Sequence, residues 1–202
     1  TDNKEDDIIH SFFLKNKIDV YRGSDWDVLD RFYKAAIYFK NEPKNIIRVC
    51  SDNPLLHSEI IDNVYNNYIK SGKDYFSNSN NEPFFLEDGF DVEIFSFNAL
   101  ESAWKNSILA SEREHVCPYI KKNFKCGWKK VNKDYNFKLS VDSIDDFKLV
   151  ELIFDELSHI KNFTIDDVVK LLVEKPHFLE INKNSRINSG YLESLKNDKE
   201  IG

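Results

Sequence analysis

The sequence contains no methionine and has few cysteines, arginines, glycines and prolines. Its three cysteines, Cys50, Cys117 and Cys126, show no CxxC spacing, so neither a disulfide framework nor a zinc knuckle is expected. No apolar run reaches the ~18–20 residues that span a bilayer. The acidic start, Thr1 to Asp7, lacks the apolar core of a signal peptide. These absences predict a cytoplasmic protein with no membrane partner.

Acidic residues outnumber basic ones, 35 to 28. The chain of 202 residues has a net charge of -7 and a pI of about 5.3, which argues against a nucleic-acid partner because phosphate binding needs a basic surface. Charged residues make up 31 % and hydrophobic residues 41 %, the balance of a soluble globular protein. We expect one domain over residues 1–175 and a polar, asparagine-rich tail over residues 176–202.

Helical and strand-like patterns alternate along the first part of the chain. Apolar spacing and capping residues predict helices near residues 8–13, 27–39, 58–69, 99–105, 112–122, 144–157 and 164–174. Short β-rich runs predict strands at 18–21, 45–50, 74–77, 92–97, 125–131 and 137–141, with a loop over 78–88. The order predicts an α/β fold of Rossmann-like type, with a mostly parallel sheet and helices on both faces.

Two aspartates follow predicted strands directly. Asp52 comes after the strand at 45–50, and Asp142 comes after the strand at 137–141. Ligands of such sheets bind beyond the carboxyl ends of the strands. Two carboxylates there suffice for Mg²⁺, which takes its remaining ligands from water and phosphate. The alternative interpretation is that each aspartate caps the following helix or turn.

The segment around Gly23 is a second candidate for binding. Arg22 and Gly23 lie between a predicted strand and a predicted helix, where the backbone can approach an anion, and Asp30 and Arg31 follow in that helix. An ordinary strand-to-helix turn with a solvated Asp30–Arg31 pair is an equal alternative.

Two further acidic groups complete the candidates. Asp88, Gly89, Asp91 and Glu93 lead into a predicted strand, where Asp91 and Glu93 share a face, although a charged edge is the simpler interpretation. Glu112 and His115 lie on one face of a predicted helix. The sequence contains no Walker loop, dinucleotide fingerprint, HExxH or GxSxG motif.

Taken in order, these segments resemble the cytidylyltransferases of the spore coat polysaccharide biosynthesis protein F type, relatives of the acylneuraminate and KDO cytidylyltransferases. The stretches that carry the resemblance are Val20–Ser24, Asp27–Tyr33, Ile47–Leu55, Asp88–Phe97, Ser111–Val116, Pro118–Ile120, Leu139–Asp142, Glu180–Asn182 and Asn188–Leu192. They cover nearly the whole chain.

The resemblance implies a nucleotide-diphospho-sugar transferase fold and a nucleotidyltransferase activity. Such an enzyme joins a nucleoside triphosphate, here CTP, to a sugar acid or sugar phosphate and releases pyrophosphate, for a surface polysaccharide or glycan. It implies that Asp52 and Asp142 bind Mg²⁺. The nucleotide side would contain Arg22, Asp30 and Arg31. The sugar side would contain Asp88, Gly89, Asp91, Glu93, Glu112 and His115.

The sequence also departs from the family pattern. Ser51 replaces the glycine that usually precedes the first metal-binding aspartate, which could change the choice of nucleotide. The family's first strand and its basic signature loop are missing, so we expect an incomplete piece of a longer enzyme with one sheet position left open. The alternatives are a guanylyl- or other nucleotidyltransferase, or a non-catalytic remnant that acts as a binding domain. Whether the protein forms a homodimer is left open.

Overall fold

The computed structural model describes residues 1–39, 43–81, 84–85, 88–130, 137–186 and 189–201. The chain forms two compact units. Unit 1 contains Thr1–Ile46, Phe95–Lys125 and Ser189–Gly202, and unit 2 contains Ile47–Ile94 and Cys126–Asn188. The domain over residues 1–175 and the tail over residues 176–202 stay predictions.

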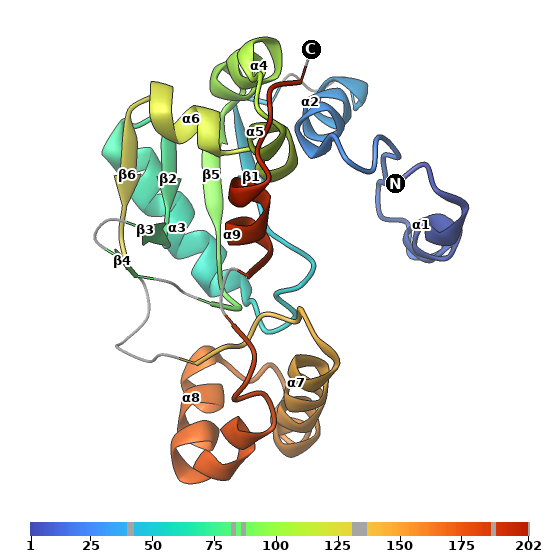
Figure 1. Cartoon of the computed structure of the whole chain (residues 1–202). Helices are drawn as coiled ribbons and strands as arrows, with labels where there is room; N and C mark the ends of the chain where they lie inside the picture. The colour runs from blue at the N-terminus through green and yellow to red at the C-terminus, as the bar shows by residue number, and fades with distance from the viewer. Residues whose placement is uncertain (40–42, 82–83, 86–87, 131–136, 187–188, 202) are drawn as a thin grey trace. The chain divides into compact units, whose positions relative to one another are not determined.

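Unit 1 is built mainly of helices (Figure 1). They are the 3₁₀ turn Lys4–Asp6 and helices α1 (Asp7–Lys15), α2 (Val28–Tyr38), α4 (Phe97–Asn106), α5 (Ala110–His115), α6 (Pro118–Asn123) and α9 (Ser189–Lys196). Helix α2 contacts α4 and α5, and α5 also contacts α9. Helix α1 has no buried residue and exposes large apolar side chains such as Ile8 and Phe12.

Unit 2 combines strands and helices. Its elements are α3 (Ser58–Ser71), β2 (Tyr75–Ser77), β3 (Asn80–Asn81), β4 (Phe84–Phe85), β6 (Cys126–Trp128), α7 (Ile144–Leu157), α8 (Ile165–Glu174) and the 3₁₀ turn Pro176–Glu180. The chain crosses between the units within β1 (Asn45–Arg48) and within β5 (Glu93–Ser96).

The main sheet has four strands in the order β1-β5-β2-β6 (Figure 1). Strands β2 and β6 pair in parallel, with Phe76 opposite Gly127, and helix α3 packs against β2. The non-sequential order requires crossover connections, so the α/β class predicted from the sequence is confirmed. Strand β1 lies at the edge of the sheet, and its residue Ile47 is 41 % exposed.

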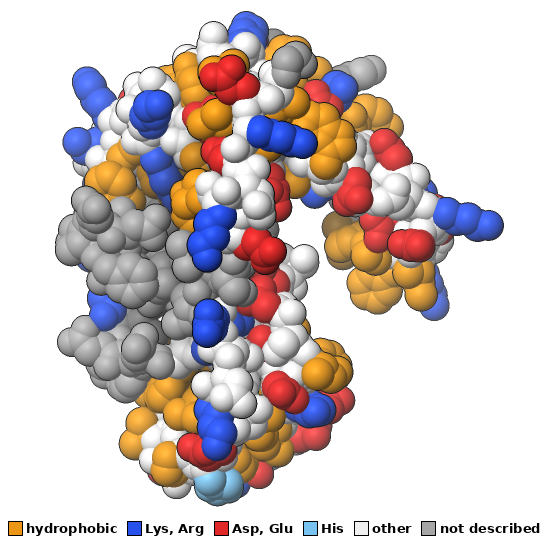
Figure 2. All heavy atoms as spheres, viewed as in Figure 1, with side chains coloured by type: hydrophobic (Ala, Val, Ile, Leu, Met, Phe, Trp, Pro, Cys, Tyr) orange, Lys and Arg blue, Asp and Glu red, His pale blue; other side chains and the backbone are white. Residues whose placement is uncertain are grey.

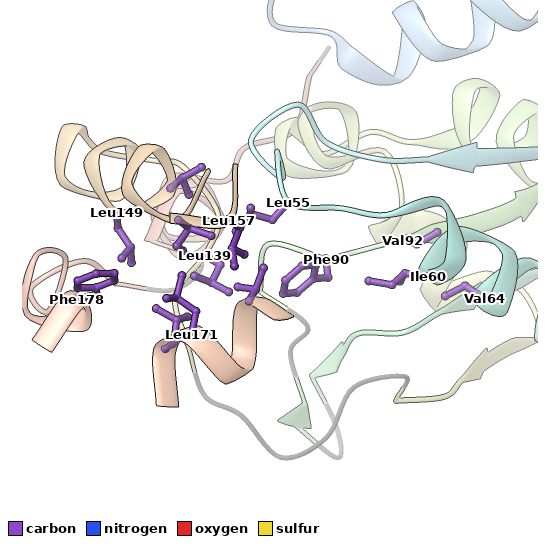
Figure 3. Packing of buried hydrophobic residues seen from close by; sticks show 14 of the residues in the cluster. Leu55, Ile60, Val64, Phe90, Val92, Leu139, Leu149, Leu157, Leu171 and Phe178 are labelled. Carbon is purple, nitrogen blue, oxygen red and sulfur yellow. The ribbon is translucent and has the colours of Figure 1, made fainter. Parts of the chain in front are cut away.

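One hydrophobic cluster organises unit 2 (Figure 3). It runs from Ile60 and Val64 on α3, through Leu55, Phe90 and Leu139, to residues of α7 and α8. The three middle residues lie close in sequence to Asp52, Asp91 and Asp142. Burial of a large apolar side chain stabilises by about 1.5–3 kcal/mol. The segments that carry the acidic candidates are therefore anchored to one core.

The helix predictions at 144–157 and 164–174 are confirmed by α7 and α8. Ser143 and Asp146 form a capping box at α7, and Thr164 and Asp167 form one at α8. Helix α3 ends at Gly72, which takes the left-handed conformation with φ 61°. Each of these boundaries depends on local chemistry, which explains why the sequence located it.

Other predictions were wrong or incomplete. No strand forms at 18–21 or at 137–141 within the described residues. The helix predicted at 112–122 is divided into α5 and α6, because Val116 adopts a φ of 67° and Pro118 starts a new helix. The predicted loop at 78–88 contains the short antiparallel pair β3–β4, and the predicted tail includes α9 and a buried Phe178. In the part of the chain that the structure describes, each helix is too short or too polar to cross a bilayer.

Candidate active site

Asp52 and Asp142, which we call the acid pair, lie close together in unit 2. The main-chain N–H of Val141 donates a hydrogen bond of 2.8 Å to the main-chain oxygen of Asp52, so the segments that carry the two aspartates are in direct contact. Burial raises the pKa of Asp52, and the negative charge of Asp142 raises it further. The structure thus brings together two carboxylates that are 90 positions apart in the sequence.

Neither aspartate acts as a helix cap. Helix α7 is capped by Ser143, whose hydroxyl accepts a hydrogen bond from the main-chain N–H of Asp146. Helix α3 begins after His57, with no side-chain cap. The Oδ1 atom of Asp52 is buried and has no hydrogen-bond partner among the described residues. Since a buried polar atom is normally paired, this oxygen is a candidate for binding a ligand.

Lys138 forms an ion pair with Asp142 and was not among the residues predicted from the sequence. Its Nζ atom lies 2.6 Å from Oδ2 of Asp142 and 2.7 Å from Oγ of Ser140. Only 8 % of Lys138 is exposed. Burial alone would lower the pKa of Lys138, but its hydrogen bond to Asp142 and the neighbouring carboxylates outweigh that effect and raise it. The ammonium therefore stays charged and fixes one oxygen of Asp142.

Lys138 also forms an ion pair with a second carboxylate, that of Asp146. Asp146 is 1 % exposed, and its Oδ2 lies 3.5 Å from Nζ of Lys138. It accepts hydrogen bonds from Ser143 at the start of α7 and from the Nδ2 atom of Asn182 at 2.9 Å. Asn182 also donates to the main-chain oxygen of Lys138 at 2.9 Å. These contacts hold Lys138 in place, and with it the orientation of Asp142.

Asp88 and Gly89 contact Leu139 and Ser140, which precede Asp142 in the chain. The carboxylate of Asp88 accepts hydrogen bonds from the main-chain N–H groups of Leu139 and Ser140. Gly89 has a φ of 85°, and a Cβ atom at this position would lie 2.7 Å from Cβ of Leu139. Only glycine tolerates both the conformation and the close approach. These residues, predicted on the sugar side, anchor the segment that precedes Asp142; a contact with sugar stays a prediction.

Asp91 and Glu93 lie near the acid pair but differ in environment. Oε1 of Glu93 accepts a 2.7 Å hydrogen bond from the Tyr75 hydroxyl, and its Oε2 forms an ion pair with Arg48. Asp91 accepts a short hydrogen bond from Ser79. Burial raises the pKa of Asp91 to about 7, helped by the negative charges of Asp88, Glu93 and Asp52 and opposed by the Ser79 hydrogen bond. Asp91 therefore changes its charge near neutral pH.

The residues predicted on the nucleotide side all lie in unit 1 and contact its own residues. Arg22 donates hydrogen bonds to the main-chain oxygens of Thr1 and Asn3 and pairs with Asp7 at 2.6 Å. Arg31 donates to the main-chain oxygen of Ser24 at 2.5 Å.

Asp30 accepts a hydrogen bond of 2.9 Å from the indole N–H of Trp104 and pairs with Lys34 at 2.8 Å. The solvated Asp30–Arg31 pair offered as an alternative from the sequence is therefore wrong, because both partners contact other groups. Whether any of these residues contacts a nucleotide stays a prediction.

Glu112 and His115 belong to unit 1 as well and share helix α5. The Glu112 carboxylate accepts hydrogen bonds from the main-chain N–H groups of Ile108 and Leu109, at 3.2 Å and 3.3 Å, and so caps the helix. The imidazole of His115 packs edge-to-face on the ring of Tyr191, with centroids 4.8 Å apart. Their sugar-binding role stays a prediction.

The sequence did contain a signal for Lys138. In an extended segment alternate residues share a face, and Lys138, Ser140 and Asp142 alternate in this way. A lysine four residues before a candidate metal ligand is a natural counter-ion. Asp146 and Asn182 gave no comparable signal, because their contacts bring together residues that are 36 positions apart.

Comparison with known proteins agrees with the geometry. A family model described as cytidylyltransferase matches residues 1–185. An uncharacterized protein of Methanocaldococcus jannaschii is 36 % identical over 195 residues, which cover 94 % of this chain and 77 % of that protein. The spore coat polysaccharide biosynthesis protein SpsF of Bacillus subtilis is 25 % identical over 183 residues, covering 87 % and 73 % of the two chains.

A solved structure is similar over most of the chain. It is that of a cytidylyltransferase from Leptospira borgpetersenii, with a TM-score of 0.79 and 26 % sequence identity. The similarity covers 93 % of this chain and 78 % of the other. The fold inferred from the strand order is thus also the fold of an experimentally determined structure.

Proposed function

Because the chain belongs to the cytidylyltransferase family, we propose that it transfers a cytidylyl group from CTP to a sugar acid or sugar phosphate and releases pyrophosphate. The resemblance recognised in the sequence is confirmed, and with it a nucleotidyltransferase activity. The finer proposal adds CTP as the nucleotide, Mg²⁺ as the cofactor, a sugar as the acceptor and a surface polysaccharide or glycan as the destination.

The observation that carries the proposal is the acid pair with its free carboxylate oxygen. Carboxylate oxygens are the protein ligands that Mg²⁺ prefers, and Oδ1 of Asp52 is buried without a hydrogen bond among the described residues. Asp142 is 47 % exposed and retains one oxygen beyond the Lys138 contact. The residues present therefore fit a magnesium ion held by Asp52 and Asp142.

The fit favours an ion that arrives with the nucleotide. No group of three or more metal-ligating side chains forms within the described residues. Mg²⁺ held by one or two carboxylates takes its other ligands from substrate phosphates and water. When bound, the ion would neutralise charge that develops on the phosphate oxygens.

In the proposed reaction a hydroxyl oxygen of the acceptor forms a bond to the α-phosphorus of CTP. The bond from that phosphorus to the β-phosphate oxygen breaks, pyrophosphate leaves, and the hydroxyl proton passes to solvent or to a nearby base. The protein supplies position rather than a covalent intermediate. Lys138 and Asp146 keep Asp142 in a fixed orientation, and the common hydrophobic cluster keeps the segment of Asp52 beside it.

Pyrophosphate release tests this proposal. The complete protein is incubated with Mg²⁺, each of CTP, GTP, UTP and ATP, and a panel of sugar acids and sugar phosphates. We expect release with CTP and a loss of roughly 10³-fold in kcat for Asp52→Asn and Asp142→Asn, equivalent to about 4 kcal/mol. Asp145→Asn is the matched control, because Asp145 pairs with Lys148 on the exposed side of the start of α7.

The outcomes separate the alternatives. Release with GTP alone would replace CTP by another nucleotide, and a shift in melting temperature with that nucleotide and Mg²⁺ would agree. If no nucleotide yields pyrophosphate with any sugar, and none raises the melting temperature, the catalytic proposal fails and a binding domain is left. Full activity in Asp52→Asn would contradict the role of the acid pair.

A further inference from the structure

A cavity of about 410 Å³ lies beside the acid pair in unit 2. Ser51 and Pro54, on the turn that carries Asp52, form one wall, and Val141, which precedes Asp142, adjoins it. The opposite wall is one face of helix α7, formed by Phe147, Val150, Glu151, Phe154 and Asp155. We call this cavity the α7 pocket. Its volume is within the range of about 300–1,000 Å³ that is typical of pockets for small ligands.

The pocket exposes aromatic surface on α7. Phe147 is 50 % exposed and Phe154 is 41 % exposed, whereas Leu149 and Ile153 on the core-facing side of α7 are fully buried. Figure 2 shows hydrophobic side chains beside acidic ones on the surface formed by α7. Exposed aromatic rings next to a cavity favour a ligand with an apolar face, because covering them removes that surface from water.

The charge of the pocket is entirely negative. Glu151 and Asp155 are four residues apart on α7 and therefore lie on the same side of the helix. Among the residues that the structure describes, no lysine, arginine or histidine lines the pocket. Within the described residues neither carboxylate forms an ion pair. Hydroxyl and amino groups of a ligand can donate hydrogen bonds here, whereas a carboxylate or phosphate would meet two like charges.

We propose that the α7 pocket binds the non-reacting part of the acceptor sugar, and that this part carries hydroxyl or amino groups and no carboxylate or phosphate. This inference rests on the proposed cytidylyl transfer. The wall that faces α7 includes two residues next to the acid pair in sequence, Ser51 beside Asp52 and Val141 beside Asp142, so a sugar in the pocket has its other end near the reacting phosphate. Any acid or phosphate group of the acceptor then lies outside the pocket.

Electrostatics favours the acceptor over the nucleotide as the occupant. CTP is the more negatively charged of the two reactants, and the acidic wall of Glu151 and Asp155 repels it. A pyranose ring presents C–H groups on one face, which pack against the rings of Phe147 and Phe154. Its hydroxyl groups, at the rim of the ring, can reach the two carboxylates.

Binding of three glucose derivatives tests the charge selectivity. The probes are methyl glucoside, glucosamine and glucuronic acid, whose carboxylate is at the end of the ring away from C1, measured by saturation-transfer NMR on the complete protein with CTP and Mg²⁺ absent. We expect the neutral and amino sugars to bind, with both weakened about 10-fold or more by Phe147→Ala. Ile144→Ala is the matched control, because Ile144 is 67 % exposed on the same helix and does not line the pocket.

Kinetics on the acceptor found in the pyrophosphate assay provides the second test. Phe147→Ala should raise KM for the acceptor about 10-fold and leave KM for CTP unchanged. Glu151→Gln should reduce the discrimination against glucuronic acid. A rise in KM for CTP instead would assign the pocket to the nucleotide. A Phe147→Ala variant that only changes from dimer to monomer would assign the surface to a second copy. Either result overturns the proposal, as does no change in any of these quantities.

The two proposals can fail separately. If no nucleotide and sugar give pyrophosphate, cytidylyl transfer fails, and the NMR measurement still decides whether the pocket holds an uncharged sugar. If pyrophosphate is released but neither sugar binding nor acceptor KM responds to Phe147→Ala, cytidylyl transfer stands and the α7 pocket proposal is wrong.

Discussion

The two units differ in how the carboxylates of their aspartates are paired. In unit 1 the Arg113 guanidinium binds both carboxylate oxygens of Asp27, and Asp30 contacts Trp104 and Lys34. In unit 2 Oδ1 of Asp52 is buried without a hydrogen bond among the described residues, next to the charge of Asp142. Asp27 and Asp30 in unit 1 therefore stabilise the fold through their contacts with other side chains, whereas Asp52 in unit 2 is available to bind a ligand.

This difference gives a rule for interpreting candidate residues. Breaking a buried ion pair is costly because it leaves one charge unpaired, so a fully paired charge is explained by stability alone. A buried oxygen with no hydrogen bond costs stability as it stands, and a ligand that binds it removes that cost. By this rule Asp52 is a stronger functional candidate than Asp30, although both looked equally polar in the sequence.

The largest effect is expected from Lys138→Ala compared with Arg113→Ala. Both variants remove a cation from its carboxylates, buried Lys138 or half-buried Arg113, at a cost of about 2–4 kcal/mol in unfolding free energy. Only Lys138 contacts the acid pair, so only its loss should also lower kcat, by about 100-fold. Urea unfolding and pyrophosphate release measure the two effects.

Two further variants complete this comparison. Lys138→Arg should recover part of kcat, because it restores a cation next to Asp142, and Lys105→Ala, at the exposed pair with Glu101, should change the unfolding free energy by under about 1 kcal/mol. Equal kcat in Lys138→Ala and Arg113→Ala would show that Lys138 acts on the fold alone.

Substitution of two glycines with positive φ tests how unit 2 anchors its acidic segments. Gly89→Ala should cost about 3 kcal/mol, since the new Cβ would clash with Leu139 in addition to the backbone strain. Gly72→Ala carries the strain without a clash and should cost about 1 kcal/mol. Fluorine NMR of fluorotryptophan distinguishes the units, because Trp104 reports on unit 1 and Trp128 on unit 2. Similar costs for both variants would refute the close packing at Gly89.

The smallest effect concerns pH, and its sign differs between the units. The pKa of Asp91 in unit 2 is raised to about 7, so the folded state binds more protons than the unfolded state between about pH 4 and pH 7. Its contribution to stability therefore falls as pH rises through this window. Asp91→Asn keeps an oxygen for Ser79 and should remove this part of the pH dependence.

Asp30 in unit 1 should behave in the opposite way. Burial alone would raise its pKa, but the hydrogen bonds from Lys34 and Trp104 outweigh burial and lower it. Its contribution is therefore present above the unfolded pKa and is lost as pH falls through the lowered value. Unfolding free energies of Asp30→Asn and Asp91→Asn between pH 3 and pH 8 check both signs. Parallel curves for the two variants would contradict the assignment.

Prediction from the sequence worked best where chemistry is local. The N-termini of α7 and α8 are marked by capping boxes whose two residues are three positions apart, and the C-terminus of α3 is marked by Gly72. Prediction failed at 137–141, where the β-rich pattern indicated a strand. The main-chain groups of this segment bond instead to the Asp88 carboxylate, to the main-chain oxygen of Asp52 and to Asn182. The partners are distant in sequence, so no local pattern could reveal them.

The sequence by itself determined the α/β class, most helix boundaries and the cytidylyltransferase resemblance, because caps, apolar spacing and ordered motifs are patterns of residues close together in the sequence. Tertiary structure alone decided which acidic residues meet. It placed Asp52 and Asp142 together, assigned Glu112 and Asp30 to structural contacts in unit 1, and buried Lys138 beside Asp142. The physical reason is that burial and charge pairing depend on neighbours in space, and those neighbours come from segments far apart in the chain.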